Sequence, residues 1–333
     1  MNVLLTGALG LLGQQVWLDL INNKNVDLIL ALYHNKGHAH LNIQKSIIVR
    51  GDLRDPQLFS SLYSSYGIDS IIHLGANAIV KNSEKAISDT FHTNILGTTY
   101  LLEAAKNAKI NRFIYMSTDK VFGDQGAIKY TENMPLNGRN AYELSKVCAD
   151  ITAQNFNSYG LKTFCVRSCN MFGLADTNFS RIVPGFISKY IKNESPTVYS
   201  DSVNRVREFI NVADTSNAIN AILTYSGESR IFNLGSGFIK TIPEMAEYIY
   251  SRAKNILGDH LTCEKYVVKN KDQFFPEIDF QVIDYTLAQK ELGYSPITST
   301  NIDVLMDNTI KYYMNYFGVK HENSLPWFMY AGN

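Results

Sequence analysis

The chain has 333 residues, 45% hydrophobic and 19% charged, which is enough for a large core of ordinary globular composition. Lysine plus arginine and aspartate plus glutamate both number 31, so no net charge indicates nucleic acid or an acidic membrane as a partner. The four cysteines fit neither a disulfide framework nor a zinc site, and there is no leader sequence or apolar run near the ~20 residues of a membrane span, so we expect a metal-free cytoplasmic protein.

The first predicted unit is a buried strand from Asn2 to Leu5, a glycine turn, and an amphipathic helix from Gln14 to Ile21. This order is typical of dinucleotide binding, because backbone without Cβ atoms lets a pyrophosphate reach the amides at a helix N-terminus. A tight turn with incidental glycines is the alternative. The residues predicted to bind NAD or NADP here are Gly7, Gly10, Leu11, Leu12 and Gly13.

A second strand is predicted from Asp27 to Leu32, and no carboxylate follows it to hold the ribose 2′-hydroxyl of NAD. His34 and Lys36 follow instead and could meet a 2′-phosphate. This pattern favours NADP over NAD, unless the loop does not touch the ribose.

Two more strands are predicted at Ser46–Arg50 and Ser70–Leu74. Asp52, just after the first, is placed to accept a hydrogen bond from the adenine amino group. Small and apolar residues at both strand ends would let the cofactor lie against the sheet. The further residues predicted to line it are Leu53, Leu74, Gly75 and Ala76.

A helix is predicted from Thr90 to Ala108, with Asn94 on an otherwise apolar pattern. A buried asparagine needs hydrogen-bond partners. Asn94 is therefore either a helix-packing amide or a polar group of the cofactor site in a position for proton relay.

The most informative stretch runs from a buried strand at Phe113–Met116 to Lys146. Tyr142 and Lys146 are four residues apart on a predicted helix and therefore share one face. A cation there would lower the pKa of the phenol from about 10, so that it could exchange a proton with a hydroxyl group. Alone, the pair could equally be an ordinary surface pair.

A sixth strand at Thr163–Arg167 completes a regular alternation of strands and helices. The alternation predicts an α/β fold with a Rossmann-type doubly wound parallel sheet and a smaller, interwoven C-terminal lobe. We expect the dinucleotide-binding domain at residues 1–170, joined again by about 205–235, and the smaller lobe mainly at 171–330. Later helices are predicted at Pro243–Lys254 and Asp284–Leu292, before an aromatic tail at Trp327–Asn333.

Taken together, these motifs resemble the extended short-chain dehydrogenase/reductases of the NAD-dependent epimerase/dehydratase type, over Met1 to about Pro296. Those that carry the resemblance are Thr-Gly-x-x-Gly-x-x-Gly, Gly51-Asp52-Leu53, His73-Leu74-Gly75-Ala76, Thr93-Asn94-x-x-Gly97-Thr98, Ser117-Thr118, Tyr142-x-x-x-Lys146 and Arg207-Glu208-Phe209-Ile210-x-Val212-x-Asp214. Within this group the chain is most similar to CDP-glucose 4,6-dehydratases, through Ser117-Thr118-Asp119-Lys120, Tyr130-Thr131-Glu132, Ser145-Lys146-x-Cys148-Ala149-Asp150 and Asn178-Phe179-Ser180-Arg181.

The resemblance implies roles for five catalytic residues. Tyr142 would take the proton of the sugar 4-hydroxyl, Thr118 would hold the 4-oxygen, and Lys146 would anchor the ribose and tune the phenol. Asp119 would act as the acid at C6, and Lys120 as the C5 base or its helper. Adjacent groups with opposite proton preferences suit a dehydration, although Asp119 and Lys120 could also be a loop ion pair worth ~0–1 kcal/mol.

The resemblance also implies a nucleotide-sugar site and a homodimer. Arginine suits phosphate oxygens, and Arg207 is preferred over its rival Arg205. Tyr199 would flank the base or lie in the core. The helices at Thr90–Ala108 and Tyr142–Ser158 resemble the four-helix dimer seam of the superfamily. The residues predicted to bind substrate are Asn170, Arg181, Tyr199 and Arg207.

Two other functions remain open. A 4-epimerase or 4-keto reductase would use Thr118, Tyr142 and Lys146 without needing Asp119 and Lys120. A non-enzymatic dinucleotide sensor on the same fold is the more remote alternative.

Overall fold

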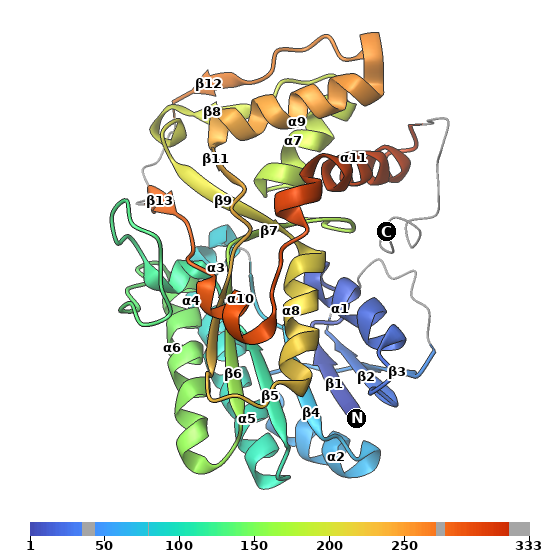
Figure 1. The fold of residues 1–333 in the computed structure, drawn as a ribbon, viewed down its shortest axis with the longest axis vertical. Coiled ribbons are helices and arrows are strands. Elements are labelled where there is room, and N and C mark those ends of the chain that lie inside the picture. The colour runs from blue at the N-terminus through green and yellow to red at the C-terminus, as the bar shows by residue number, and fades with distance from the viewer. Residues whose placement is uncertain (35–43, 79, 271–276, 320–333) are drawn as a thin grey trace.

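A seven-stranded parallel sheet forms the larger part of the molecule (Figure 1). The computed structural model describes residues 1–34, 44–78, 80–270 and 277–319, so Lys36 and the aromatic tail lie outside the described residues. The strand order is β10-β6-β5-β4-β1-β2-β3, and it reverses between β1 and β4, where doubly wound sheets bind ligands. The strands are β1 Asn2–Thr6, β2 Leu28–Tyr33, β3 Ser46–Arg50, β4 Ser70–His73, β5 Arg112–Met116, β6 Thr163–Ser168 and β10 Ile231–Leu234.

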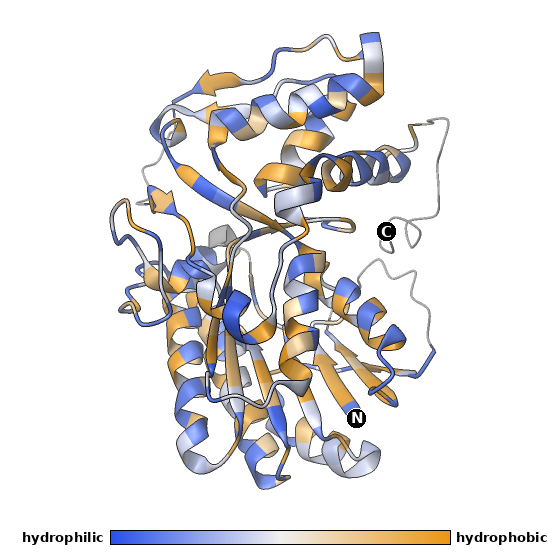
Figure 2. Ribbon diagram, viewed as in Figure 1, coloured by the Kyte–Doolittle hydropathy of each residue, from blue (hydrophilic) through white to orange (hydrophobic). Residues whose placement is uncertain are grey.

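Helices cover both faces of this sheet, which explains why its central strands are apolar throughout (Figure 2). On one face lie α1 (Leu11–Asn22), α8 (Val212–Thr224) and α10 (Thr286–Leu292). On the other lie α2 (Pro56–Tyr66), α5 (Gly97–Asn107) and α6 (Ala141–Asn155). The predicted doubly wound fold is confirmed.

Two predicted helices differ in detail from the observed ones. The helix expected at Thr90–Ala108 is divided into α4 (Ile87–Phe91), a π-helical turn η1 (His92–Leu96) and α5. The π turn turns Asn94 inward, where the side chain is 2% exposed. The helix expected from Asp284 begins at Thr286, because the Asp284 carboxylate accepts a hydrogen bond from the Thr286 amide.

A smaller lobe lies beyond the carboxyl ends of the parallel strands (Figure 1). It has its own apolar core between α7 (Ile182–Ile191), α9 (Ile242–Leu257) and α11 (Thr298–Tyr316). Short strands connect this core to the sheet. They are β7 Asn170–Phe172, β8 Thr197–Tyr199, β9 Val206–Asn211, β11 Ile239–Thr241, β12 Val267–Lys269 and β13 Phe280–Gln281.

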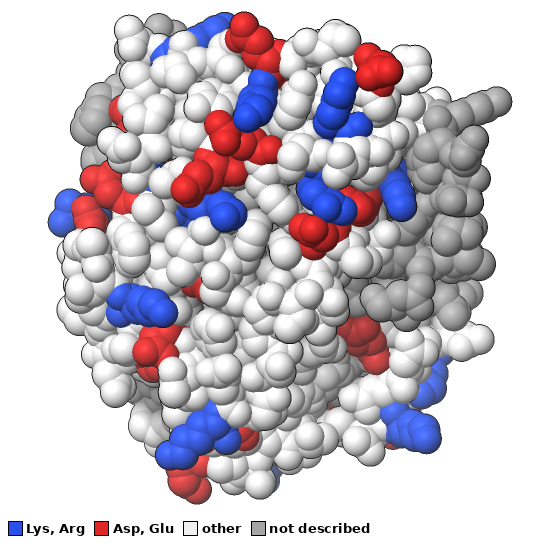
Figure 3. Space-filling model, turned by 45° about the horizontal axis from the view of Figure 1, so that its top comes forward, with Lys and Arg blue, Asp and Glu red and all other residues white. Residues whose placement is uncertain are grey.

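Acidic and basic side chains are mixed on the face drawn in Figure 3, in keeping with the zero net charge of the chain. Among the described residues, no helix is both long enough and apolar enough to cross a bilayer.

A buried ion pair joins α6 to β6 beneath the carboxyl end of β5. The Asp150 carboxylate accepts from Arg167 Nε at 3.0 Å and Nη2 at 2.9 Å, and from Ser117 Oγ at 2.5 Å. Both Asp150 and Arg167 are almost completely buried. The pair therefore holds Ser117 and the end of β5 against the helix that carries Tyr142.

Replacing Arg167 with methionine should lower the free energy of unfolding by about 3–5 kcal/mol, because the Asp150 carboxylate then stays buried without its cation. Urea denaturation monitored by circular dichroism measures this loss. Arg252→Met, which breaks a more exposed pair with Asp307, should have a much smaller effect. Equal losses of unfolding free energy in the two variants would show that the buried pair contributes no more to stability than the exposed pair.

Candidate active site

The glycine turn between β1 and α1 fits a dinucleotide pyrophosphate. Gly10 precedes the helix, and no side chain caps its first turn. A Cβ atom on Gly13 would lie 2.1 Å from the Gly7 carbonyl oxygen, and one on Gly7, where φ is 67°, would lie 2.8 Å from the Gly75 amide nitrogen. Only glycine fits at these two positions, and the positive end of the helix stays open to an anion beside Leu11 and Leu12.

The residues that follow β2 and β3 form a cluster of one acidic and two basic side chains. Asp52 accepts from Arg54 Nη2 at 2.6 Å and lies 3.3 Å from His34 Nε2. Hydrogen bonds from Arg54 are the largest cause that lowers the pKa of Asp52, to about 2. A carboxylate held ionised beside His34 opposes a 2′-phosphate, so the geometry does not support the preference for NADP predicted from His34 and Lys36.

The end of β4 is organised by His73, for which the sequence suggested a place in a motif but no role of its own. Its ring nitrogens lie 2.7 Å from Thr6 Oγ1 and 2.9 Å from Thr98 Oγ1, and Thr6 Oγ1 accepts from the Gly75 amide at 3.0 Å. Burial is the main cause that lowers the pKa of His73 to about 3, so the ring is neutral. His73 therefore fixes Leu74, Gly75 and Ala76 against the glycine turn, beside buried Leu53.

Asn94 is a fully engaged amide. Its Oδ1 accepts from the Asn77 amide at 2.7 Å, and its Nδ2 donates to the Asn77 carbonyl at 3.0 Å and to Ser145 Oγ at 2.9 Å. Ser145 in turn donates to the carbonyl of Tyr142 at 2.7 Å. Asn94 thus braces the start of α6, and its role toward the cofactor or in proton relay stays a prediction.

A capping box places Tyr142 in the first turn of α6. The Asn140 side chain accepts from the Glu143 amide, and the Glu143 carboxylate accepts from the Asn140 amide. One turn later, Lys146 Nζ donates to the Met116 carbonyl at 2.6 Å and lies 4.4 Å from the centre of the Tyr115 ring. Both predicted catalytic side chains therefore meet the end of β5.

The ionisation of this pair differs from the sequence-based expectation. Burial is the largest cause that raises the pKa of Tyr142 to about 12, while Arg181 and a hydrogen bond with Thr118 lower it. Burial also lowers the pKa of Lys146 to about 8. The expected lowering of the phenol pKa is wrong for the protein alone, because desolvation outweighs the nearby cations.

The residues after β5 bring an acid and an amine beside Tyr142. Thr118 caps a short 3-10 turn, η2 (Asp119–Phe122), and its Oγ1 lies 3.1 Å from Asp119 Oδ1. Asp119 is 1% exposed, and its charge raises the pKa of Tyr142. Lys120 Nζ lies 4.0 Å from Asp119 Oδ1, an ion pair at the limit of contact, so the alternative of a loop ion pair stays open beside the catalytic prediction.

The predicted substrate residues line different parts of the lobe. Arg207 is buried and donates to the carbonyls of Val206 and Asp279 at 2.9 and 3.4 Å. Its rival Arg205 is already bound by three carboxylates, whereas Arg207 has one carboxylate, that of Glu277, at 4.0 Å. Arg207 is therefore the better phosphate candidate.

Arg181 pairs with Asp176 at 3.0 Å, and its side chain is 38% exposed. The positive charge of Arg181 lowers the pKa of Tyr142. Asn170 lies beside Lys120, its Oδ1 accepting from Lys120 Nζ at 3.3 Å, so its predicted contact with the diphosphate stays a prediction. Tyr199 is 40% exposed, which excludes the alternative that it is a core tyrosine.

Glu208 has a structural role that could not be predicted from its place in the Arg207-Glu208-Phe209 motif. Its Oε1 accepts from the amides of Ser236 and Gly237, both at 2.7 Å, and its Oε2 from the amide of Ile283 at 2.8 Å. It joins β9 to the segments after β10 and β13, and so holds the smaller lobe to the sheet next to Arg207.

Comparison with known proteins identifies the family of this chain. The sequence model of the NAD dependent epimerase/dehydratase family matches residues 3–235. The low-salt glycan biosynthesis protein Agl12 of Haloferax volcanii is 32% identical over 71% of this chain and 77% of that protein. The dTDP-glucose 4,6-dehydratase of Haemophilus influenzae is 26% identical over 94% of this chain and 98% of its own. The structure of UDP-glucose 4-epimerase from Thermotoga maritima, with UDP-glucose, shares the fold with a TM-score of 0.84 at 23% identity, covering 95% of this chain and all of that one.

Proposed function

Because this chain belongs to the NAD-dependent epimerase/dehydratase family, we propose that it is a nucleotide-sugar 4,6-dehydratase, which converts an NDP-hexose to an NDP-4-keto-6-deoxyhexose. The observation that carries this proposal is the buried Asp119, with Lys120 beside it, next to Tyr142 and Thr118. A relative named as a dTDP-glucose 4,6-dehydratase, similar over nearly its whole length, supports the same reaction.

Four side chains of the protein are assigned to proton transfer or hydrogen bonding in this reaction. Tyr142 takes the proton of the 4-hydroxyl, and Thr118 hydrogen-bonds the 4-oxygen as it becomes a ketone. Lys120 then takes the C5 proton that this ketone acidifies, and Asp119 gives a proton to the C6 hydroxyl, which leaves as water. Lys120 gives its proton back to C5 when hydride reaches C6. NAD, when bound, supplies positive charge and an acceptor that receives a hydride from C4 and returns it to C6, so the sugar loses water with no net oxidation.

The residues around the cofactor fit this role for NAD. The bare glycine turn suits the pyrophosphate, Asp52 with Leu53 the adenine end, and Lys146 the ribose near the nicotinamide. A 4-epimerase or 4-keto reductase would need only Thr118, Tyr142 and Lys146, and is the alternative activity. This alternative activity gives no reason for the burial of Asp119.

The proposal is tested by incubating the purified protein, with NAD, with CDP-glucose, dTDP-glucose and UDP-glucose in parallel. A dehydratase should give one product that has lost one water by mass spectrometry, with a carbonyl at C4. An isomer of unchanged mass would instead identify an epimerase. The resemblance favours CDP-glucose and the relatives are named for dTDP-glucose, so the base stays a prediction until this comparison is made.

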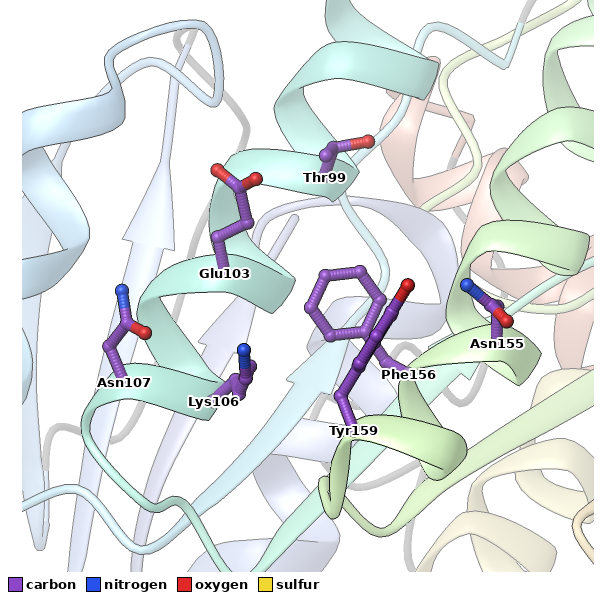
Figure 4. Close-up of a pocket in the computed structure, with 7 residues that line it drawn as sticks. All are labelled: Thr99, Glu103, Lys106, Asn107, Asn155, Phe156 and Tyr159. Atoms are coloured by element: carbon purple, nitrogen blue, oxygen red, sulfur yellow. The ribbon is translucent and has the colours of Figure 1, made fainter.

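We also propose a homodimer through α5 and α6. Large apolar side chains are exposed here, with Leu144 and Ile151 of α6 exposed by 41% and 54%, and Leu96, the last residue of η1 before α5, by 45%. A hollow of about 560 Å³ opens between the length of α5 and the C-terminal end of α6, roughly 20 Å along α6 from Tyr142 (Figure 4). The residues lining it are Thr99, Glu103, Lys106, Asn107, Asn155, Phe156 and Tyr159.

Light scattering should give the mass of a dimer for the wild type and of a monomer for Ile151→Glu.

A further inference from the structure

The side chain of Gln281 reaches from the smaller lobe to both members of the acid and amine pair. Gln281 ends β13 and is 1% exposed. Its Nε2 lies 3.4 Å from Asp119 Oδ2, and its Oε1 lies 3.3 Å from Lys120 Nζ. The amide is therefore closer to each group than the two groups are to each other, at 4.0 Å.

The chemistry of the partners fixes the direction of this amide. A lysine side chain can donate to an oxygen in either protonation state, so Gln281 Oε1 faces Lys120 and the Nε2 hydrogens face Asp119. Asp119 Oδ2 is then held as an acceptor. Oδ1 accepts from Thr118 Oγ1 at 3.1 Å, so both carboxyl oxygens of Asp119 have a donor beside them.

Strand β9 sets the position of Gln281. Gln281 is the register partner of Arg207, through the parallel pairing of β13 with β9. A second amide, that of Asn170, also presents its oxygen to Lys120, while its Nδ2 donates to the carbonyl of Glu208 at 3.1 Å. The strand that carries the phosphate candidate thus also supports both amides that contact Lys120.

We propose that Gln281 is the positioning residue that keeps Asp119 and Lys120 apart for the elimination step, an inference that rests on the proposed dehydratase function. Without the amide, the two groups can close from 4.0 Å to a hydrogen-bonded ion pair. A direct ion pair stabilises the carboxylate and the ammonium more strongly than hydrogen bonds to a neutral amide do. In those forms Asp119 has no proton to give to the leaving C6 hydroxyl, and Lys120 cannot take the C5 proton.

Gln281→Met tests the proposal, because methionine has a similar length and forms neither contact. The enzyme loaded with NAD is mixed with CDP-glucose, dTDP-glucose and UDP-glucose, and the absorbance of NADH and the release of the 4-keto-6-deoxy product are followed separately. Oxidation at C4 should stay close to the wild-type rate, while product release falls on the order of 10²-fold and NADH accumulates. Gln289→Met, the same change at an exposed position of α10, should behave as wild type.

Three results would overturn the inference. They are an unchanged rate of product release, an equal loss of both steps, and full activity of Gln281→Glu, which keeps the acceptor for Lys120 but removes the donor to Asp119. Gln281→Glu also carries the test if Gln281→Met does not fold. A wild-type enzyme that removes water from none of the three sugars is a distinct outcome, since it refutes the dehydratase function and this inference with it.

Discussion

Tyr142→Phe should lower turnover of a nucleotide glucose on the order of 10²–10⁴-fold, with folding and bound NAD close to wild type. The phenol oxygen is the group proposed to take the 4-hydroxyl proton, and the remaining ring still fills its buried site. Because burial raises the pKa of this phenol to about 12, the protein alone favours its neutral form. The positive charge of NAD, together with Arg181 and Thr118, must therefore favour the phenolate for the first step.

The measurement is single-turnover formation of NADH, with thermal unfolding as the check on folding. Tyr66→Phe, the same change at the end of α2, is the matched control and should keep full activity. If Tyr142→Phe forms NADH as fast as the wild type, another group takes the proton and the assignment of α6 as the catalytic helix is wrong.

Asp119→Asn should block loss of the C6 hydroxyl and leave oxidation at C4 measurable. The amide has nearly the same shape as the carboxylic acid but cannot transfer its proton, so product release should fall on the order of 10²–10⁴-fold while NADH accumulates. Both steps are followed in one stopped-flow experiment, with product identified by mass.

The control is Asp124→Asn, an exposed aspartate of the following loop, which should behave as wild type. Equal loss of C4 oxidation and C6 cleavage in Asp119→Asn would refute the division of roles between Asp119 and Tyr142. It would leave a simpler redox isomerase as the remaining function.

The sheet and the local motifs could be predicted from the sequence because their signals are short-range. The run Val3-Leu4-Leu5 followed by the glycine turn determines a strand, a turn and a helix within about 20 residues. Tyr142 and Lys146 lie one helical turn apart, and the Asn140 capping box places them at the start of α6. These signals need no knowledge of tertiary contacts.

The remaining features depend on contacts between distant segments. Gln281 lies 162 residues after Asp119, and a single glutamine on a two-residue strand carries no pattern of its own. The pKa of Tyr142 was predicted in the wrong direction, because the helix spacing shows a nearby cation but not the degree of burial. The same holds for Asp52, whose charge beside His34 changed the interpretation of the cofactor.

The path of the hydride tests the central claim most directly. Nucleotide glucose carrying deuterium at C4 is incubated with the protein and NAD, and the product is analysed by NMR and mass spectrometry. A dehydratase built around Tyr142 and Asp119 should deliver the deuterium to C6 of a sugar that has lost water. Deuterium that remains at C4 of an isomer would contradict the account.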